Sequence, residues 1–167
     1  MSAPADTTFL AAIERIATEV AAPNATAVDQ EARFPGETID AMRAEQLLSA
    51  FVPAELGGAG VSFEAVAEAC LLLGRNCGAA AMVYAMHQIQ IVTIVRHLDD
   101  APWFEEYLKR VVAEQRLVAS VTSELGTGGD MGRSVAAVTP ADDGTVSFSK
   151  QAPTVSYGRH ADDLFVT

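Results

Sequence analysis

The periodicity of the sequence changes at Leu117, and this change constrains the fold more than any other feature. Before it, apolar residues recur every three or four positions, as on one face of an amphipathic helix. After it, residues 118–123 alternate with a period of two, as in a β-strand. The chain is therefore predicted to be mainly α with a β segment, divided into an α-helical domain over residues 1–116 and the start of a β-domain over residues 117–167.

Five or six helices are expected before the first strand. The expected helices cover residues 8–33, with a break near Pro23, then residues 37–48, 62–74, 79–98 and a last stretch that starts at Pro102. Ser62 is a suitable N-cap for the third of them. The third and fourth helices are so apolar that each must be packed on more than one face.

The β part is expected to contain further short strands after residues 117–123. β-prone runs occupy residues 134–139, 145–149 and 164–167. The chain stops inside the last of these runs, and a few strands without their neighbours leave unpaired edges. We therefore expect Thr167 to be a truncation point, and we expect the isolated chain to expose apolar surface and to self-associate.

Charge and targeting signals restrict the class of partner. The net charge is -11, with 22 acidic against 11 basic side chains, so nucleic acid is not an expected partner, whereas a small anionic ligand stays possible.

Cys70 and Cys77 are expected to be reduced, buried and without a metal. No secretory signal is visible, and residues 79–95 contain His87 and two glutamines, which favours a buried helix over a membrane span. The sequence predicts a cytoplasmic protein.

The segment from Val121 to Asp130 carries the clearest chemical signal. Hydroxyl side chains at a strand end are followed by a glycine-rich stretch, so the backbone can approach a flat polar ligand and hydrogen-bond its edge. The alternative reading of the same residues is a tight hairpin with capping hydroxyls. The sequence contains no spacing typical of a zinc site, a nucleophile elbow or a phosphate-binding loop.

This segment resembles the flavin-contacting signature of acyl-CoA dehydrogenases, in which a Thr or Ser, a Glu, a glycine-rich turn and an Asp follow one another. The matching residues are Ser123, Glu124, Gly126, Gly128 and Asp130. Leu125 stands where the family usually has Pro, and Gly129 stands where it usually has Ser or Thr. Further resemblance covers Phe34-Pro35, the 52–60 connector, the helix end at 73–75 and His87, which is itself expected to be a core residue rather than a catalyst.

The resemblance implies a fold and a set of flavin contacts. The fold would be an N-terminal helical bundle followed by the first strands of a β-barrel domain, with the C-terminal helical domain absent. Thr122 and Ser123 would hydrogen-bond the flavin ring, and the backbone at Gly128 and Gly129 would lie near phosphates of cofactor or substrate. Ser156 would supply a further hydroxyl.

Residues 150–158 fall where the family has a strand that carries a flavin-packing aromatic residue. In this sequence that position falls on Thr154, so the aromatic ring is either absent or supplied by Tyr157 from a shifted register. The other reading of the segment is an ordinary β-strand that follows Pro153.

The resemblance also implies an activity, which is FAD-dependent α,β-dehydrogenation of an acyl-CoA thioester, with electrons passed to electron-transfer flavoprotein or another acceptor. In the family the base is a Glu of the C-terminal helical domain, beyond Thr167, so no catalytic residue and no metal ligand is assigned here. Alone, this chain is expected to be inactive. A homo-oligomer is expected. The alternatives are a flavin-dependent monooxygenase of the same fold and a non-catalytic partner subunit that uses its apolar helices as a binding surface.

Overall fold

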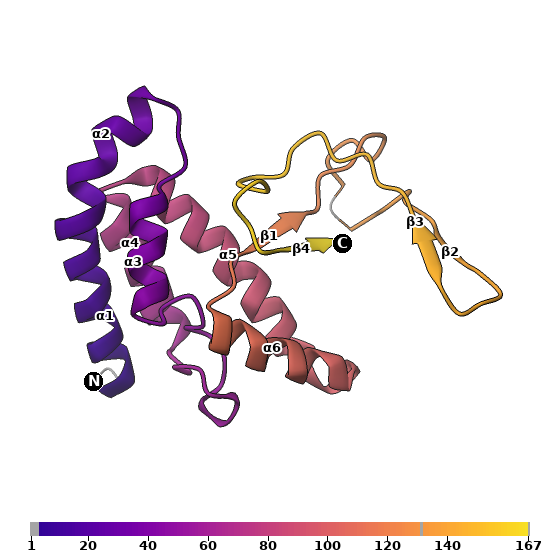
Figure 1. Cartoon of the computed structure of the whole chain (residues 1–167), viewed down its shortest axis with the longest axis horizontal. Helices are drawn as coiled ribbons and strands as arrows, with labels where there is room; N and C mark the ends of the chain where they lie inside the picture. The colour runs from indigo at the N-terminus through magenta and orange to yellow at the C-terminus, as the bar shows by residue number, and fades with distance from the viewer. Residues whose placement is uncertain (1–3, 131, 167) are drawn as a thin grey trace.

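The computed structural model describes residues 4–130 and 132–166, and it shows a helical bundle followed by a β segment (Figure 1). The helices are α1 (Pro4–Ile16), a π-helical turn (Ala17–Ala21), α2 (Ala22–Gln30), α3 (Gly36–Ala44), a 3-10 turn (Ala54–Leu56), α4 (Phe63–Gly74), α5 (Gly78–Arg96), a 3-10 turn (Leu98–Asp100) and α6 (Pro102–Glu114). The strands are β1 (Val118–Val121), β2 (Val138–Pro140), β3 (Val146–Phe148) and β4 (Asp163–Val166). The predicted class, mainly α with a β segment, is confirmed.

Two apolar clusters form most of the core of the bundle. The first is built from α1, α3, α4 and α5, and the second from α5, α6 and the connector after α3. Leu117 is fully buried in the first cluster and Val118 in the second. The chain therefore enters its β segment from inside the helical core, which fixes where β1 begins.

The start of α4 follows the expectation from sequence. The Ser62 hydroxyl accepts a hydrogen bond from the backbone N–H of Ala65 at 3.1 Å, as an N-cap does. Asp6 of α1 in turn accepts hydrogen bonds from the Ser62 N–H at 2.9 Å and the Ser62 hydroxyl at 2.8 Å. This link holds the start of α4 against the start of α1.

The predicted break near Pro23 is wrong, because the helix continues through this residue. A proline ring clashes with the carbonyl four residues earlier and offers no N–H to it. The chain avoids the clash by widening into the π-helical turn, in which the Ala22 N–H donates to the carbonyl of Ala17, five residues back.

The predicted end of the second helix, near Leu48, is also wrong, because α3 ends at Ala44. Gln46 adopts a left-handed backbone conformation with φ of 58°, which an α-helix does not tolerate. Leu47 and Leu48 therefore enter the core from a turn, and their backbone carbonyls point toward α5 rather than into a helix.

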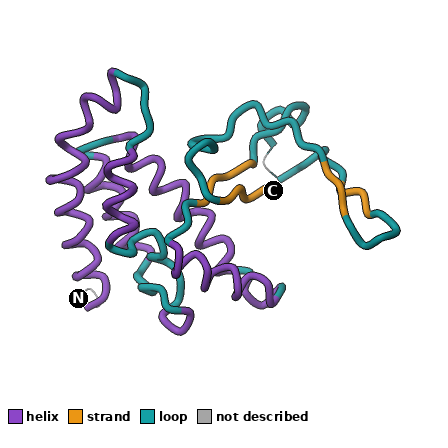
Figure 2. The backbone as a smooth tube through the Cα atoms, viewed as in Figure 1, coloured by secondary structure: helices purple, strands orange, loops and turns teal. Residues whose placement is uncertain are grey.

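The β segment contains little regular structure, and Figure 2 shows loops over most of its length. β1 pairs with β4 in parallel, with Val118 opposite Asp163, and β2 pairs with β3 in an antiparallel hairpin. The strand expected over residues 150–158 is wrong, because this segment forms turns. Tyr157 has a φ of 44°, outside the β region, and Ser123 holds the backbone of Thr154.

Helix α5 is long and apolar enough to cross a membrane, by length and composition. In this structure it lies at the centre of the bundle, in contact with α2, α3, α4, α6 and β1. Its polar residues His87, Gln88 and Gln90 are buried. Packing among five elements accounts for its apolar composition.

Candidate functional site

The ends of β1 and β4 are tied to the helical bundle by two adjacent carboxylates. The Arg116 guanidinium binds both carboxylate oxygens of Asp163, with Nε at 2.5 Å and Nη2 at 2.8 Å, and the Tyr107 hydroxyl donates to the same carboxylate at 2.9 Å. The hydrogen bonds from Arg116 lower the pKa of Asp163. Asp162 accepts from the Leu117 N–H and from Arg43 of α3, each at 2.7 Å.

The glycine-rich turn that follows β1 has a backbone that only glycine adopts readily. Gly126, Gly128 and Gly129 have φ values of 95°, 62° and 88°. Apart from its chain neighbours, a Cβ atom built at any of the three would meet no atom of residues 4–130 and 132–166 within 4 Å. The turn thus presents bare backbone to open space, as the approach of a ligand to the main chain requires.

The predicted hydroxyl contacts have partners within the chain. Thr122 and Ser120 share a hydrogen bond of 2.7 Å between their hydroxyls. The Ser123 hydroxyl donates to the Thr154 carbonyl at 2.6 Å and lies 3.4 Å from the Thr154 N–H. Ser123 therefore joins the strand end to the 150–158 segment, which carries Ser156, a half-buried residue.

A second link between these two segments is an ion pair. Glu124 and Lys150 lie 3.5 Å apart, and their side chains are 3% and 4% exposed. Burial raises the pKa of Glu124, but hydrogen bonding by Ser134, the Lys150 charge and the Val135 N–H outweigh it and lower this pKa. The Val135 N–H reaches Glu124 Oε1 at 3.2 Å. Glu124 thus links the start of the glycine-rich turn to Lys150 and to Val135, which lies six residues after Gly129.

His87 is a fully buried core residue, as predicted, but its contacts reach further than the sequence indicates. Its Nε2 lies 2.8 Å from the Leu48 carbonyl, and its Nδ1 accepts the Val118 N–H at 3.1 Å. Burial lowers the pKa of His87 to about 4, so the ring is neutral at pH 7. A sequence signal for these buried contacts does exist. The spacing of Tyr84, His87 and Gln88 places three polar groups on one face of an apolar helix.

Tyr157 connects the 150–158 segment to β1 and to the helical bundle. Its hydroxyl donates to the Val118 carbonyl at 2.9 Å, and its ring packs on the first core cluster. Thr154, at the position where the family has an aromatic residue, is exposed. Of the two alternatives for this position, the packing of Tyr157 against the helical core favours the absence of a flavin-packing ring.

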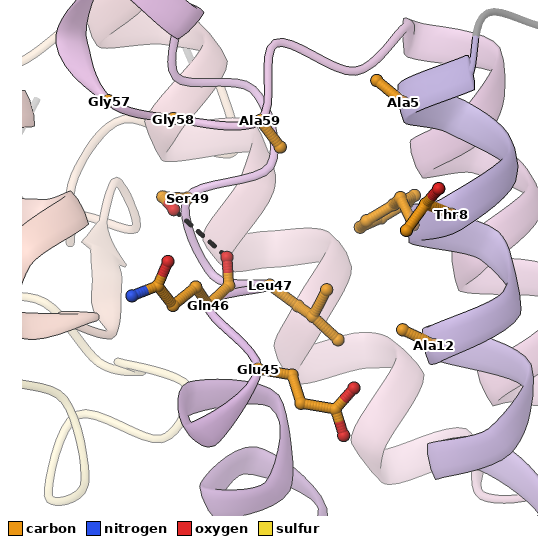
Figure 3. A pocket seen from close by; sticks show the side chains of 11 residues that line it. Ala5, Thr8, Ala12, Glu45, Gln46, Leu47, Ser49, Gly57, Gly58 and Ala59 are labelled. Atoms are coloured by element: carbon orange, nitrogen blue, oxygen red, sulfur yellow. Dashed lines mark hydrogen bonds between the residues drawn. The ribbon is translucent and has the colours of Figure 1, made fainter.

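A separate pocket of about 580 Å³ lies between α1 and the connector that follows α3. Figure 3 shows Ala5, Thr8 and Ala12 on the α1 side, and opposite them lie Glu45, Gln46, Leu47 and Ser49. Glu45, on its rim, is paired with Arg15. None of the predicted flavin-contacting residues lines it. Among residues 4–130 and 132–166, no group of three side chains is arranged to hold a metal ion.

Comparison with known proteins assigns this architecture to a class. The family described as acyl-CoA dehydrogenase, N-terminal domain, matches residues 4–115. This chain belongs to the acyl-CoA dehydrogenase family, whose members bind flavin. The resemblance in sequence and the predicted fold are both confirmed.

Two curated relatives are acyl-CoA dehydrogenases. Cyclohex-1-ene-1-carbonyl-CoA dehydrogenase of Syntrophus aciditrophicus is 29% identical over 121 residues, which are 71% of this chain and 29% of the relative. Cyclohexane-1-carbonyl-CoA dehydrogenase of Geobacter metallireducens is 28% identical over 151 residues, 87% of this chain and 40% of the relative. The chain therefore spans between 29% and 40% of the length of these relatives.

Solved structures of the same fold include proteins of other activities. KijD3 in complex with FMN and a dTDP-amino-sugar is 26% identical, with a TM-score of 0.78, over 98% of this chain and 40% of that protein. The dibenzothiophene monooxygenase TdsC of Paenibacillus sp. A11-2 is 19% identical, with a TM-score of 0.79, over 96% of this chain and 38% of that protein. The fold alone therefore does not select between dehydrogenase and oxygenase chemistry.

Proposed function

We propose that this chain is part of an FAD-dependent acyl-CoA dehydrogenase and contributes one edge of its flavin site. The observation that carries the proposal is the glycine-rich turn after β1, which is fixed at its start by Ser123 and Glu124 and left open along its bare backbone. The donor set fits a flavin, since hydroxyls at a strand end suit the polar edge of the ring and free backbone suits a diphosphate.

Each residue has a distinct part in this proposal. The hydroxyl of Thr122 binds the polar edge of the ring, and the backbone at Gly128 and Gly129 lies along phosphate groups. Ser156 adds a hydroxyl from the opposite segment. Ser123 has two alternatives. Its hydroxyl either leaves the Thr154 carbonyl and binds the flavin ring, or it keeps that hydrogen bond and holds the two segments together.

The chemistry is divided between cofactor and protein. Bound flavin supplies the hydride acceptor, while the residues of this chain orient it and exclude water from its edge. The proton-abstracting carboxylate is assigned to none of these 167 residues. The proposal includes an acyl-CoA substrate, electron-transfer flavoprotein or another acceptor, a homo-oligomer and a cytoplasmic location.

A flavin-dependent monooxygenase is the second candidate. Thr154 is exposed where dehydrogenases of the family have an aromatic residue, and Tyr157 packs against the helical core. A site without that ring is more open on one side, which suits an enzyme that admits oxygen to reduced flavin. The structural similarity to a dibenzothiophene monooxygenase supports this candidate at the level of the fold.

Anaerobic titration of the full-length protein with acyl-CoA thioesters separates these candidates. Bleaching of a bound flavin band by a thioester supports the dehydrogenase. Bound flavin that no thioester reduces supports the monooxygenase, and absence of flavin supports the non-catalytic partner subunit.

A matched pair of glycine variants tests the location of the site. Gly129→Ala and Gly144→Ala introduce the same strain, because both glycines have positive φ and open surroundings, but Gly144 lies in the turn between β2 and β3. Only Gly129→Ala is expected to weaken flavin binding. Equal flavin content in the two variants would remove the glycine-rich turn from the proposed site.

A further inference from the structure

We infer that His87 and Tyr157 are positioning residues for the flavin site, because together they hold both backbone groups of Val118 at the start of β1. We call the two hydrogen bonds from His87 and Tyr157 to Val118 the clamp. The effect of the clamp on flavin binding rests on the proposed function, whereas the clamp itself does not. Neither residue is expected to touch the cofactor.

The clamp lies on the edge of β1 that faces away from β4. In a strand, the backbone groups of successive residues point to opposite edges. The Leu117 carbonyl accepts the Asp162 N–H at 2.8 Å, so Leu117 bonds toward the β4 side. Val118 therefore points to the other edge, where its N–H donates to His87 and its carbonyl accepts from Tyr157. Two side chains take the place of a neighbouring strand at this residue.

His87 is itself held by a rigid frame. Since its Nδ1 accepts from Val118, the neutral ring carries its proton on Nε2 and donates it to the Leu48 carbonyl. The Gln88 side chain donates to the same carbonyl at 2.9 Å, and the Leu48 N–H donates to the Gln115 side chain at 3.0 Å. A shift of His87 would require a shift of the whole turn at Leu48.

The clamp acts on the proposed site through the stiffness of the strand. Thr122 lies four residues after Val118, about 13 Å along an extended chain. A slip of β1 by one residue would turn Thr122 to the opposite face of the sheet. The ties of Val118 therefore determine which face of the strand carries the hydroxyls of Ser120 and Thr122.

The test compares three substitutions in the full-length flavoprotein. His87→Phe and Tyr157→Phe each remove one bond to Val118 and keep an aromatic ring. Tyr84→Phe is the control, because Tyr84 lies on the same helix as His87, is equally buried and donates its hydrogen bond to Leu47 rather than to Val118. Hydrogen exchange of the Val118 amide and visible circular dichroism of the flavin are measured for each variant.

We expect His87→Phe to accelerate exchange at Val118 by about tenfold, as loss of one buried hydrogen bond implies. We also expect His87→Phe to change the flavin dichroism, Tyr157→Phe to change both quantities in the same direction, and Tyr84→Phe to change neither quantity. His87→Gln, which offers an amide donor and a carbonyl acceptor, should restore the flavin signal in part.

Unchanged exchange at Val118 in both His87→Phe and Tyr157→Phe would overturn the clamp, as would an equal effect of Tyr84→Phe. If His87→Phe does not fold, Tyr157→Phe decides alone, because Tyr157 is only half-buried. A wild-type protein without flavin would refute the proposed function, while the exchange rates would still decide whether His87 and Tyr157 hold Val118.

Discussion

The helical bundle and the β segment are held in place by different interactions. In the bundle, large apolar side chains such as Ile91, Leu73 and Leu108 are fully buried. In the β segment, apolar side chains of β2, β3 and β4 are exposed by more than half; these are Val138, Val146, Phe148 and Leu164. The bundle folds around its own core, whereas the β segment is fixed mainly by contacts with the bundle.

Beyond the apolar burial of Leu117 and Val118, those contacts are largely polar and aromatic. They include the Arg116–Asp163 and Arg43–Asp162 pairs, the hydroxyl of Tyr157 on Val118, and the stacking of His160 on Phe34 with ring centroids 4.2 Å apart. A segment held by contacts of this kind is expected to open locally at lower free energy than a segment held by a buried core.

One leucine from each half tests this contrast most strongly. Leu108→Ala in α6 should lower the free energy of unfolding by about 2–5 kcal/mol, because Leu108 is fully buried. Leu164→Ala in β4 should change it by no more than about 0.5 kcal/mol, because Leu164 is 55% exposed. Chemical denaturation followed by far-UV circular dichroism measures both. Similar losses would mean that the β segment has a core of its own.

Acidification should weaken the bundle through His87. Burial is the main cause that lowers the pKa of this group from 6.5 to about 4; the Arg43 charge acts in the same direction and the Asp162 charge opposes it, so between these pH values the unfolded chain binds a proton that the folded chain does not. Stability is complete above pH 6.5 and falls by up to about 3 kcal/mol as pH decreases toward 4. Asp163, whose pKa is lowered by Arg116, adds its loss only below about pH 4.

Denaturation at a series of pH values between 7 and 4 measures this loss. His87→Phe is expected to flatten the slope in this window, and an unchanged slope in that variant would assign the acid sensitivity to other groups.

The polar anchor of the β segment should have a smaller effect. Arg116→Ala is expected to cost about 1–3 kcal/mol, because Arg116 makes two charge-assisted bonds to Asp163 and both side chains are less than a quarter exposed. Arg33→Ala removes a more exposed pair with Glu37 inside the bundle and should destabilise the protein less than Arg116→Ala does. Hydrogen exchange of β4 amides should increase in the first variant and not in the second.

The exposed apolar residues should affect association more than stability. The 167-residue chain is expected to self-associate through its uncovered surface, and Phe148→Ser on β3 should reduce this with little change in unfolding. Static light scattering over a range of concentrations measures the effect. If the unsubstituted chain is a monomer at all concentrations, these exposed side chains do not drive self-association.

Elements with local signals could be predicted from the sequence. α4 begins after the expected cap, Ser62, and α6 begins at the expected proline, Pro102, because capping and proline geometry act within a few residues. The family motif around Ser123 and Gly128 was likewise visible in a short stretch. The expected boundary at 116/117 and the flavin contacts of Thr122, Ser123, Gly128, Gly129 and Ser156 stay predictions.

Features that depend on distant partners could not be predicted. The strand expected at 150–158 does not form, because Ser123, some thirty residues earlier, binds the Thr154 backbone and Tyr157 turns back to the bundle. Periodicity indicated that His87 is buried but not that it joins Leu48 to Val118. Such contacts are decided by tertiary packing, which leaves no local trace in the sequence.

The π-helical turn before Pro23 also changes how the sequence should be aligned with that of relatives. At about 100° per residue, a regular helix would place Val28 about 100° away from the buried Phe9, whereas a turn that absorbs one extra residue brings the two onto one face. The turn thus acts as a one-residue insertion that the fold tolerates. An ungapped alignment through residues 17–21 would shift every position of either α1 or α2 by one and pair buried residues with exposed ones.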